Sequence, residues 1–372
     1  MKQEELLYRL ALTRLPGIGL ITAHQLLHAT GGNASLLFEE RNTLKERIPD
    51  MPERLVKVFD CPDILRLCEA ELRFAEKNHI SCLTADDEAY PSRLRECDDA
   101  PLVLFYRGTA NLNKLHILSI VGTRNATEYG KDICYRFISD LQQLLPDALI
   151  VSGLAYGIDI HAHRTALQQG LETIGVLAHG LDRLYPHAHR QTATEMLTQG
   201  GLLTEFISGT NPDKQNFVKR NRIVAGISDA TLVVESAEKG GSLITAGIAE
   251  SYNRDCFAFP GRIDAPYSAG CNRLIRTNRA ALLQSAEEFV QAMNWDTPAA
   301  QPPSAIQRQL FPELSSDEEQ IVRLLETHTE GIQINALVVA SNIPVNRMTS
   351  ILFELEMKGI VRTMAGGMYK LI

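Results

Sequence analysis

Three short turns that combine glycine with hydroxyl or basic residues are the segments of the sequence best suited to bind an anion. Each follows an apolar run typical of a strand and precedes a pattern typical of a helix. In a parallel α/β sheet such turns lie together at the carboxyl edge, where helix N-termini present unpaired N–H groups and a partial positive charge to a phosphate. The turns are Gly122-Thr123-Arg124, Ser152-Gly153 and Gly240-Gly241-Ser242.

A basic segment with an aromatic residue lies between the second and third turns. It contains Phe217, Lys219, Arg220, Asn221 and Arg222. Arg124 follows a glycine turn directly, where its guanidinium group can hold a phosphate with two hydrogen bonds. Phe217 offers a ring on which a base can stack, and packing into the core is the alternative that the sequence leaves open. Charge, ring and helix N-termini together favour a flexible single strand over a rigid duplex.

Other phosphate-binding chemistries are disfavoured by residue spacing. A P-loop would require glycine and a hydroxyl residue where the chain has Asn125 and Asp132, so we expect no ATP hydrolysis there. Gly153 and Gly157 do not follow the dinucleotide-binding pattern. We therefore expect no nicotinamide or flavin cofactor.

Candidate nucleophiles and metal ligands have simpler explanations. Neither Ser152 nor Ser242 lies in a Gly-x-Ser-x-Gly pattern, so we assign no catalytic residue and expect capping or phosphate contact instead. His161 and His163 would point to different faces of a helix, and no further ligands complete a tetrahedral set, so we expect no metal site. Asp159 is interpreted as a cap of the helix that follows it.

The elements that must position these turns alternate between strand and helix. Helical patterns are clearest at residues 127–145 and 157–169. The alternation predicts an α/β fold with an extended Rossmann-like, doubly wound and mostly parallel sheet. Strands are expected at residues 79–83, 116–121, 148–152, 172–178, 201–205, 230–235 and 255–259.

The sequence on either side of this sheet indicates further modules. Residues 1–60 are expected to form a helical module around a turn that resembles a helix-hairpin-helix. Gly17 and Gly19 of that turn are candidates for a duplex or phosphate contact, and a plain helical turn is the alternative. Residues 61–296 would form the Rossmann-like domain, and residues 297–312 a proline-rich linker.

Residues 313–372 are expected to form a winged helix. Helical patterns at residues 315–326, 334–341 and 345–358 precede two strand-like runs joined by Gly366-Gly367. The prospective recognition helix carries Arg347 but also Glu354 and Glu356, so its basic footprint is thin. Protein–protein contact is therefore at least as favoured as DNA binding for this domain.

Bulk composition limits the class of protein. The 372 residues carry a formal net charge of -8, which argues against a generally basic nucleic-acid binder but not against a local basic groove. The 7 cysteines form no Cys-x-x-Cys pair, which favours a reducing compartment over a disulfide framework or a zinc site. Because no signal-peptide pattern or membrane-spanning run is found, we expect a cytoplasmic protein without membrane insertion.

Ordered motifs run through residues 90–278. They are Tyr90-Pro91, Val121-Gly122-Thr123-Arg124, Tyr129-Gly130, Ser152-Gly153-Leu154-Ala155-x-Gly157-Ile158-Asp159, Ala162-His163, Tyr185-Pro186, Arg220-Asn221-Arg222-Ile223, Gly241-Ser242-Leu243-Ile244-Thr245-Ala246 and Pro260-Gly261. This set resembles the DprA/Smf family of DNA-processing proteins. The resemblance implies a non-enzymatic protein that binds single-stranded DNA during natural transformation, protects incoming strands and helps load the recombinase RecA. It also implies a homodimer formed through the extended Rossmann domain.

The resemblance also places the family's DNA pocket on this sequence. The corresponding residues are Gly122, Thr123, Arg124, Ser152, Gly153, Phe217, Lys219, Arg220, Asn221, Gly240, Gly241 and Ser242. Three residues depart from the family pattern. Val218 stands where proline is usual, which puts the rigidity of that loop in question. Gly240 replaces a common serine. Asn278 replaces a glycine, and asparagine tolerates a left-handed backbone conformation.

Two alternative functions come from other classes. A nucleotide hydrolase of the lysine-decarboxylase-like Rossmann group also uses a glycine-rich phosphate turn. However, no glutamate follows the Gly240 turn at that group's spacing, and Glu250 lies later in the chain. A transcription regulator acting through the winged helix would need a more basic recognition surface.

Overall fold

The chain divides into two compact units, Met1–Thr297 and Pro298–Ile372. The computed structural model describes residues 2–40, 48, 51–295, 314–328, 331–364 and 367–371. The first unit includes both the helical module and the sheet, so a domain boundary near residue 60 stays a prediction. The linker expected at residues 297–312 lies outside the described residues.

The first unit is built on a sheet whose described strands follow the order β1-β2-β6-β5-β4-β3-β7-β8-β9. Neighbours from β6 to β9 along this order are parallel, whereas β2 pairs antiparallel with both β1 and β6. The predicted α/β fold with a mostly parallel sheet is thereby confirmed. The strands are β1 (Ser81–Leu83), β2 (Leu104–Gly108), β3 (Ile117–Val121), β4 (Leu149–Ser152), β5 (Glu172–Val176), β6 (Gly200–Thr204), β7 (Ala230–Val233), β8 (Asp255–Ala258) and β9 (Ala281–Leu282).

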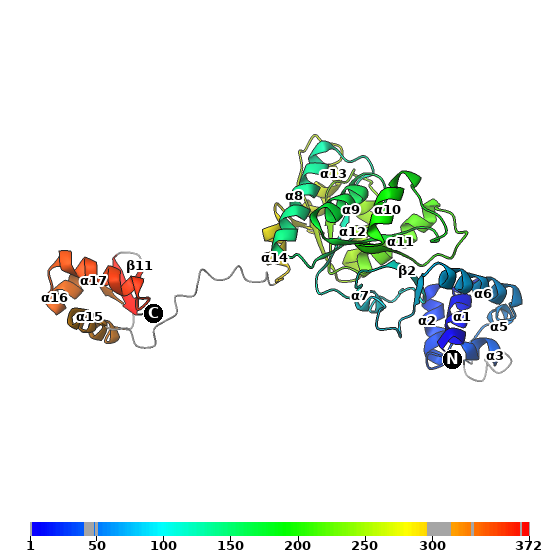
Figure 1. Ribbon diagram of the computed structural model, residues 1–372, viewed down its shortest axis with the longest axis horizontal. Coiled ribbons are helices and arrows are strands. Elements are labelled where there is room, and N and C mark those ends of the chain that lie inside the picture. The colour runs from blue at the N-terminus through cyan, green and yellow to red at the C-terminus, as the bar shows by residue number, and fades with distance from the viewer. Residues whose placement is uncertain are drawn as a thin grey trace. The chain divides into compact units, whose positions relative to one another are not determined.

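Helices cover both faces of this sheet (Figure 1). Ile117 and Val121 of β3 belong to one apolar core, whereas Leu118 and Ile120 belong to another, because successive side chains of a strand point to opposite faces. Helices α7 (Ser92–Arg95), α11 (Lys214–Gly226), α12 (Ser242–Ser251) and α13 (Ala269–Arg276) contribute to the first core. Helices α8 (Glu128–Leu144), α9 (Ile158–Gln169) and α14 (Ala286–Ala292) contribute to the second.

The winding direction of the sheet reverses between β3 and β7. The chain runs from β3 to β4, β5 and β6 on one side of β3, whereas β7 and β8 follow on its other side. In open α/β sheets, ligands bind outside the carboxyl ends of the strands at such a switch point. The turns after β3, β4 and β7 therefore lie where a ligand site is expected. A short 3-10 turn, His187–His189, and helix α10 (Arg190–Met196) lie between β5 and β6.

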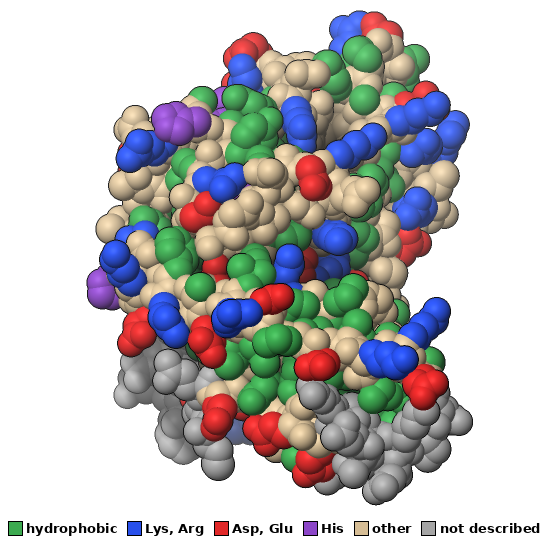
Figure 2. Space-filling model, turned by 90° about the vertical axis from the view of Figure 1, so that its right-hand side faces the viewer, with side chains coloured by type: hydrophobic (Ala, Val, Ile, Leu, Met, Phe, Trp, Pro, Cys, Tyr) green, Lys and Arg blue, Asp and Glu red, His purple; other side chains and the backbone are tan. Residues whose placement is uncertain are grey.

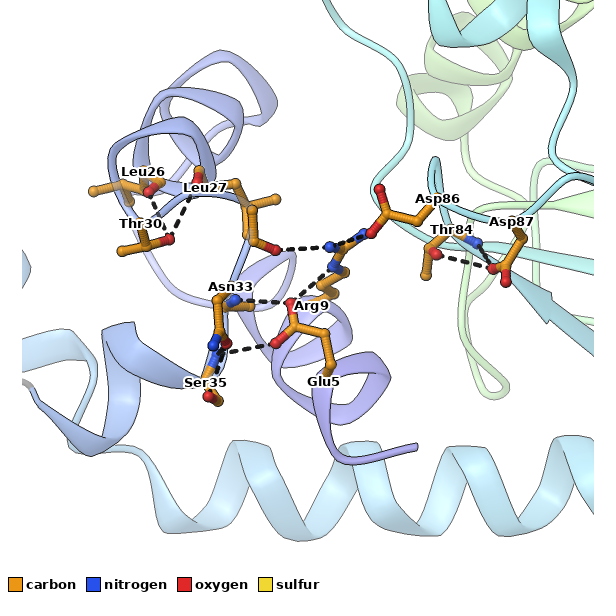
Figure 3. A network of polar contacts seen from close by, with 12 residues as sticks. Glu5, Arg9, Leu26, Leu27, Thr30, Asn33, Ser35, Thr84, Asp86 and Asp87 are labelled. Carbon is orange, nitrogen blue, oxygen red and sulfur yellow. Dashed lines mark hydrogen bonds and ion pairs between the residues drawn. The ribbon is translucent and has the colours of Figure 1, made fainter. Parts of the chain in front are cut away.

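The N-terminal helices pack against the antiparallel end of the sheet. They share an apolar core with Phe105 of β2 and with Ile207. Figure 3 shows the polar part of this contact, in which Arg9 donates from Nε to Glu5 over 2.9 Å and places Nη2 2.5 Å from the carboxylate of Asp86. Asp86 follows β1, so the Arg9–Asp86 pair joins the module to the sheet. The helices are α1 (Lys2–Leu12), α2 (Leu20–Ala29), α3 (Ser35–Glu39), α5 (Glu53–Val58) and α6 (Pro62–Lys77).

The second unit is a winged helix, which confirms the prediction for this part of the chain. Ser315 and Glu318 form a capping box that starts α15, and Leu337, Met348 and Leu352 lie in the core of the unit. Its elements are α15 (Ser316–Glu326), β10 (Ile332–Gln333), α16 (Ile334–Ser341), α17 (Val345–Met357), β11 (Val361–Met364) and β12 (Met368–Leu371). Within the described ranges no single helix is long and apolar enough to cross a bilayer, and α16 and α17 meet that test only as a pair bent by 110°.

Candidate nucleic-acid interface

A cavity of about 760 Å³ opens where the turns after β3, β4 and β7 meet helix α11. The structure brings most of the predicted binding residues to it. Those that line the cavity are Gly122, Thr123, Arg124, Gly153, Phe217, Arg220, Asn221, Gly240, Gly241 and Ser242. Residues from separate parts of the sequence thus form one surface, whereas Ser152, Lys219 and Arg222 do not line it.

The turn after β3 is held in place by its neighbours. Thr123 donates its N–H to the carbonyl of Glu235 over 2.7 Å, and its own carbonyl accepts from the N–H of Ile158 over 3.1 Å. A Cβ atom on Gly122 would lie 2.4 Å from the Ile158 side chain, and one on Gly157 would lie 2.1 Å from the Thr123 carbonyl oxygen. Glycine at both positions therefore permits the close approach of the first two turns.

The Glu235 carboxylate fixes the start of α8. It accepts a hydrogen bond from the Thr127 N–H over 2.9 Å and another from the Thr127 hydroxyl over 2.6 Å. Because Thr127 is also the N-cap of α8, the Gly122 turn and the following helix are anchored to the end of β7. These contacts hold the backbone of the Gly122 turn in a fixed position at the edge of the cavity.

Helix α11 turns one side of its basic sequence toward the cavity. Asp213 caps the helix by accepting from the N–H of Asn216 over 2.9 Å. Phe217, Arg220 and Asn221 lie three and four residues apart, which places them on the same face, and all three line the cavity. The run of four polar residues read from the sequence is therefore divided between two sides of a helix.

Arg220 is the most deeply buried cation of the cavity. It is 4% exposed and donates from Nη1 to the carbonyl of Val176 over 2.7 Å. Its Nε has no hydrogen-bond partner among the described residues. Burial lowers the pKa of the guanidinium to about 10, opposed by the nearby charge of Asp159, so the group is still protonated at neutral pH. A buried, charged and incompletely bonded guanidinium favours an anionic ligand.

Phe217 lies close to two guanidinium groups. The Cζ atom of Arg124 is 4.8 Å from the centroid of the Phe217 ring, and that of Arg220 is 5.9 Å away. Tyr185 approaches the same ring edge-on at 6.0 Å between centroids. Since Phe217 is only half-buried and lines the cavity, its ring is not simply part of the core. The arrangement offers an aromatic face beside two cations of a type that can bind phosphate.

The positive charge of the cavity is local. Arg124, Lys214, Arg220 and Lys239 line it, and Asp159 is the acidic residue among the described lining residues. Elsewhere, Lys and Arg side chains are interspersed with Asp and Glu over the face that Figure 2 shows. A chain with a net charge of -8 can therefore present a cationic binding site at one edge of its sheet.

Asp159 was not predicted to belong to the site. The Ala155 N–H lies 3.4 Å from its Oδ2, so its carboxylate bonds the turn before α9, and the expected N-cap role is wrong because Gly157 occupies that position. Burial raises the pKa of the Asp159 carboxyl, and the positive charge of Arg220 is the main opposing effect. Tyr185, Lys214 and Lys239 were also missed. Asp159 and Tyr185 both lie in motifs quoted from the sequence, whereas Lys214 and Lys239 lie in none of them.

Three of the predicted binding residues have other contacts. Ser152 is fully buried and donates its hydroxyl to the carbonyl of Ile120 over 2.6 Å. Arg222 is buried on the opposite side of α11, where it bonds the Glu205 carboxylate and, over 2.7 Å, the carbonyl of Asp99. Lys219 is exposed, and its charge acts on Glu205. These three side chains therefore do not line the cavity with Arg220.

The three departures from the family pattern have distinct local consequences. Val218 lies within helix α11, so the expectation of a loop there is wrong. Unlike proline, valine has a backbone N–H group, which a residue in the interior of a helix can donate to the backbone. A Cβ atom on Gly240 would lie 2.3 Å from the hydroxyl of Ser236, so glycine fits closely. Asn278 adopts a φ of 55°, the left-handed backbone expected of it.

Other candidate residues of the sequence lie away from the cavity. Gly17 and Gly19 lie in the turn before α2, and a Cβ atom on either would meet no atom within 4 Å. Glu250 forms an ion pair with Arg279 over 2.7 Å and does not line the cavity. His163 bonds the hydroxyl of Thr173 over 2.7 Å, and burial lowers its pKa to about 3. Among the described residues, no group of three or more His, Cys, Asp or Glu could hold a metal ion.

Two family models match adjoining parts of the chain. The model described as DNA recombination-mediator protein A matches residues 81–294, and the DprA winged helix domain matches residues 297–367.

Curated relatives align over much of the same region. Protein Smf of Escherichia coli is 35% identical over 315 residues, which cover 82% of this chain and 80% of that protein. DNA processing protein DprA of Streptococcus pneumoniae is 40% identical over 204 residues, 55% of this chain and 71% of that protein. Protein Smf of Synechocystis sp. is 40% identical over 217 residues, 57% of this chain, and the chain spans about half of its length, 53%.

Solved structures show the same likeness. The X-ray structure of DNA processing protein A from Streptococcus pneumoniae is similar with a TM-score of 0.56 and 31% identity, covering 74% of this chain and 98% of that one. DNA processing protein A from Helicobacter pylori, whose single-stranded DNA binding mode was described structurally, has a TM-score of 0.53 and 29% identity over 59% of this chain and 97% of that one.

Proposed function

The chain belongs to the DNA recombination-mediator protein A family, also called DprA/Smf, and from this premise we propose that it binds single-stranded DNA in the cavity at the carboxyl edge of its sheet. The observation that carries the proposal is the pairing of the incompletely bonded Arg220 guanidinium with the half-exposed ring of Phe217. A single strand can place a phosphate on the cation and a base on the ring at the same time. In a duplex the bases are already stacked and paired, so the ring has no free partner.

The test compares one labelled oligonucleotide as a single strand and as a duplex, with fluorescence anisotropy as the readout. We expect the single strand to bind more tightly at every salt concentration, and log affinity to fall linearly with log salt for both. Equal affinity for strand and duplex would overturn the proposal. Release of free base from nucleoside monophosphates would instead favour the hydrolase alternative.

The biological setting is proposed from family membership. We propose that the protein acts in the cytoplasm as a homodimer during DNA uptake, protects incoming strands and helps load RecA onto them. A strand-exchange assay with RecA and strands coated by a single-strand binding protein tests the loading step. We expect the protein to shorten the lag before exchange begins. An unchanged lag at saturating protein would refute this part of the proposal, and analytical ultracentrifugation would test the dimer.

Replacement of Arg124 by alanine is expected to weaken single-strand binding about five- to tenfold, because it removes one phosphate contact at an accessible edge. The slope of log affinity against log salt should become shallower by about 0.7, the value for one neutralised phosphate of a single strand. A salt titration of the variant measures both effects. Lys219→Ala is the control, since it also removes one positive charge, but from a residue of α11 that does not line the cavity. A larger loss in Lys219→Ala than in Arg124→Ala would contradict the assignment.

Replacement of Phe217 by alanine should lower single-strand affinity without changing the salt slope. Loss of one base–aromatic stacking contact costs about 1–3 kcal/mol, so we expect a decrease of roughly 5- to 150-fold. Phe217→Tyr keeps a stacking ring and should retain most of the affinity. The same salt titration separates the two variants from Arg124→Ala, because stacking releases no counterions. A shallower slope in Phe217→Ala would show that the ring acts by placing the cations.

A further inference from the structure

The exposed side of helix α17 carries an apolar strip. Phe353 and Met357 are each 63% exposed and Val345 is 54% exposed. Met357 follows Phe353 by four residues, so these two side chains lie on one side of the helix, and Val345 lies at the start of the helix, about 80° around it from Phe353. The opposite side, with Met348 and Leu355, is buried in the core of the unit. The strip is therefore additional to the residues that hold the winged helix together.

Acidic residues border this strip. Glu354 and Glu356 are both exposed and lie on either side of Phe353 around the helix. Glu356 also accepts the N–H of Thr363 over 3.2 Å, which fixes it beside the hairpin. The centre of the exposed face is thus apolar, and both of its margins are negatively charged.

The basic residues of these helices in the described part of the unit are engaged in ion pairs. Arg323 pairs with Glu319 at 3.4 Å, Arg347 with Asp317 at 2.5 Å, and Lys358 with Glu318 at 2.6 Å. Winged-helix proteins that bind DNA insert the helix in the position of α17 into the major groove, between two rows of phosphates. The exposed carboxylates of Glu354 and Glu356 would repel those phosphates, so the exposed face of α17 is poorly suited to DNA.

We propose that the strip on α17 binds a segment of another protein in which apolar side chains are flanked by Lys or Arg. The apolar residues of such a segment would cover Phe353 and Met357, which removes apolar surface from water. Its basic residues would lie against Glu354 and Glu356 and set its orientation. A second copy of the same strip fits poorly, because a twofold contact would bring the same carboxylates together.

The test uses the full-length protein and two labelled synthetic helical peptides with the same row of leucines. One peptide carries Lys on both sides of the row, and the other carries Glu. By fluorescence anisotropy at low salt, we expect the Lys peptide to bind at least about tenfold more tightly than the Glu peptide. Phe353→Ser should weaken binding of the Lys peptide about tenfold or more, the effect of exposing a buried aromatic contact. Glu354→Lys combined with Glu356→Lys should reverse the preference between the peptides.

Glu326→Lys is the matched control, since it changes an exposed charge of α15 outside the strip and should leave both affinities unchanged. Equal affinity for the two peptides would overturn the proposal, as would an unchanged affinity in Phe353→Ser. Two further results would assign the strip to a different occupant and also overturn it. One is duplex DNA binding that Phe353→Ser weakens. The other is self-association, measured by sedimentation, that Phe353→Ser abolishes.

Discussion

Replacement of Gly153 by alanine is expected to weaken single-stranded DNA binding about 10- to 150-fold while leaving the fold intact. A Cβ atom at this position would lie 1.8 Å from Nη1 of Arg220, so the guanidinium group must move out of its place in the cavity. Hydrogen bonds that involve a charged group contribute about 1.5–3 kcal/mol, which sets the size of the loss. Far-UV circular dichroism and strand affinity together measure the result.

Two comparisons test whether Gly153→Ala acts through Arg220. Gly241→Ala places a methyl group in the same cavity, where a Cβ atom meets no atom within 4 Å, and should have a much smaller effect. In an Arg220→Ala background, Gly153→Ala should cause little further loss, because the displaced group is already absent. Additive losses in the double variant would show that glycine at 153 serves another purpose, such as direct approach of the DNA backbone.

Replacement of Arg222 by methionine is expected to lower the free energy of unfolding by about 3–5 kcal/mol, the typical effect of removing one partner from a buried ion pair. The Arg222 side chain is 8% exposed and that of its partner Glu205 is 14% exposed. The folded variant should still bind single-stranded DNA with nearly unchanged affinity, since Arg222 does not line the cavity. Urea unfolding and anisotropy at a temperature where the variant is folded measure the two effects separately.

The stability deficit of Arg222→Met should depend on pH. Burial raises the pKa of the Glu205 carboxyl, and Arg222 is the main group that opposes this rise. Without Arg222 the folded-state pKa lies still further above the unfolded value, so the deficit is present at neutral pH. It should shrink as the pH falls through the folded-state pKa and Glu205 becomes protonated. A deficit that is constant with pH, or a loss of DNA binding in folded protein, would refute this role for the ion pair.

The sequence was sufficient to locate the parallel strands from β3 to β8 and the cavity at their carboxyl edge, whereas β2 and β9 were not among the predicted strands. The strands around Ile120, Ile150 and Leu232 are short apolar runs buried on both faces, so they stand out from the amphipathic helices between them. Once the strands are placed, the parallel arrangement fixes the turns at Gly122, Gly153 and Gly240 to one edge. The winged helix was predictable for a similar reason, because its helices and hairpin have separate periodic patterns.

Helix α11 shows why the individual binding residues were harder to assign. In the sequence Lys219, Arg220 and Arg222 form one basic cluster. In a helix, successive residues are about 100° apart, so Arg220 faces the cavity while Arg222 faces Glu205 and Asp99. The partners of Arg222 come from distant parts of the chain, and no local pattern indicates them.

The amino-acid sequence by itself therefore determined most of the secondary structure, the fold class, and the edge of the sheet at which the glycine turns lie. These features follow from short-range periodicity and backbone preferences. Only the tertiary structure decided that Arg220 is buried with no partner for its Nε among the described residues, that Asp159 lines the cavity, and that Arg222 is buried against Glu205. Burial and charge pairing depend on segments that meet only in the folded chain, and they determine which polar side chains are left to contact a ligand.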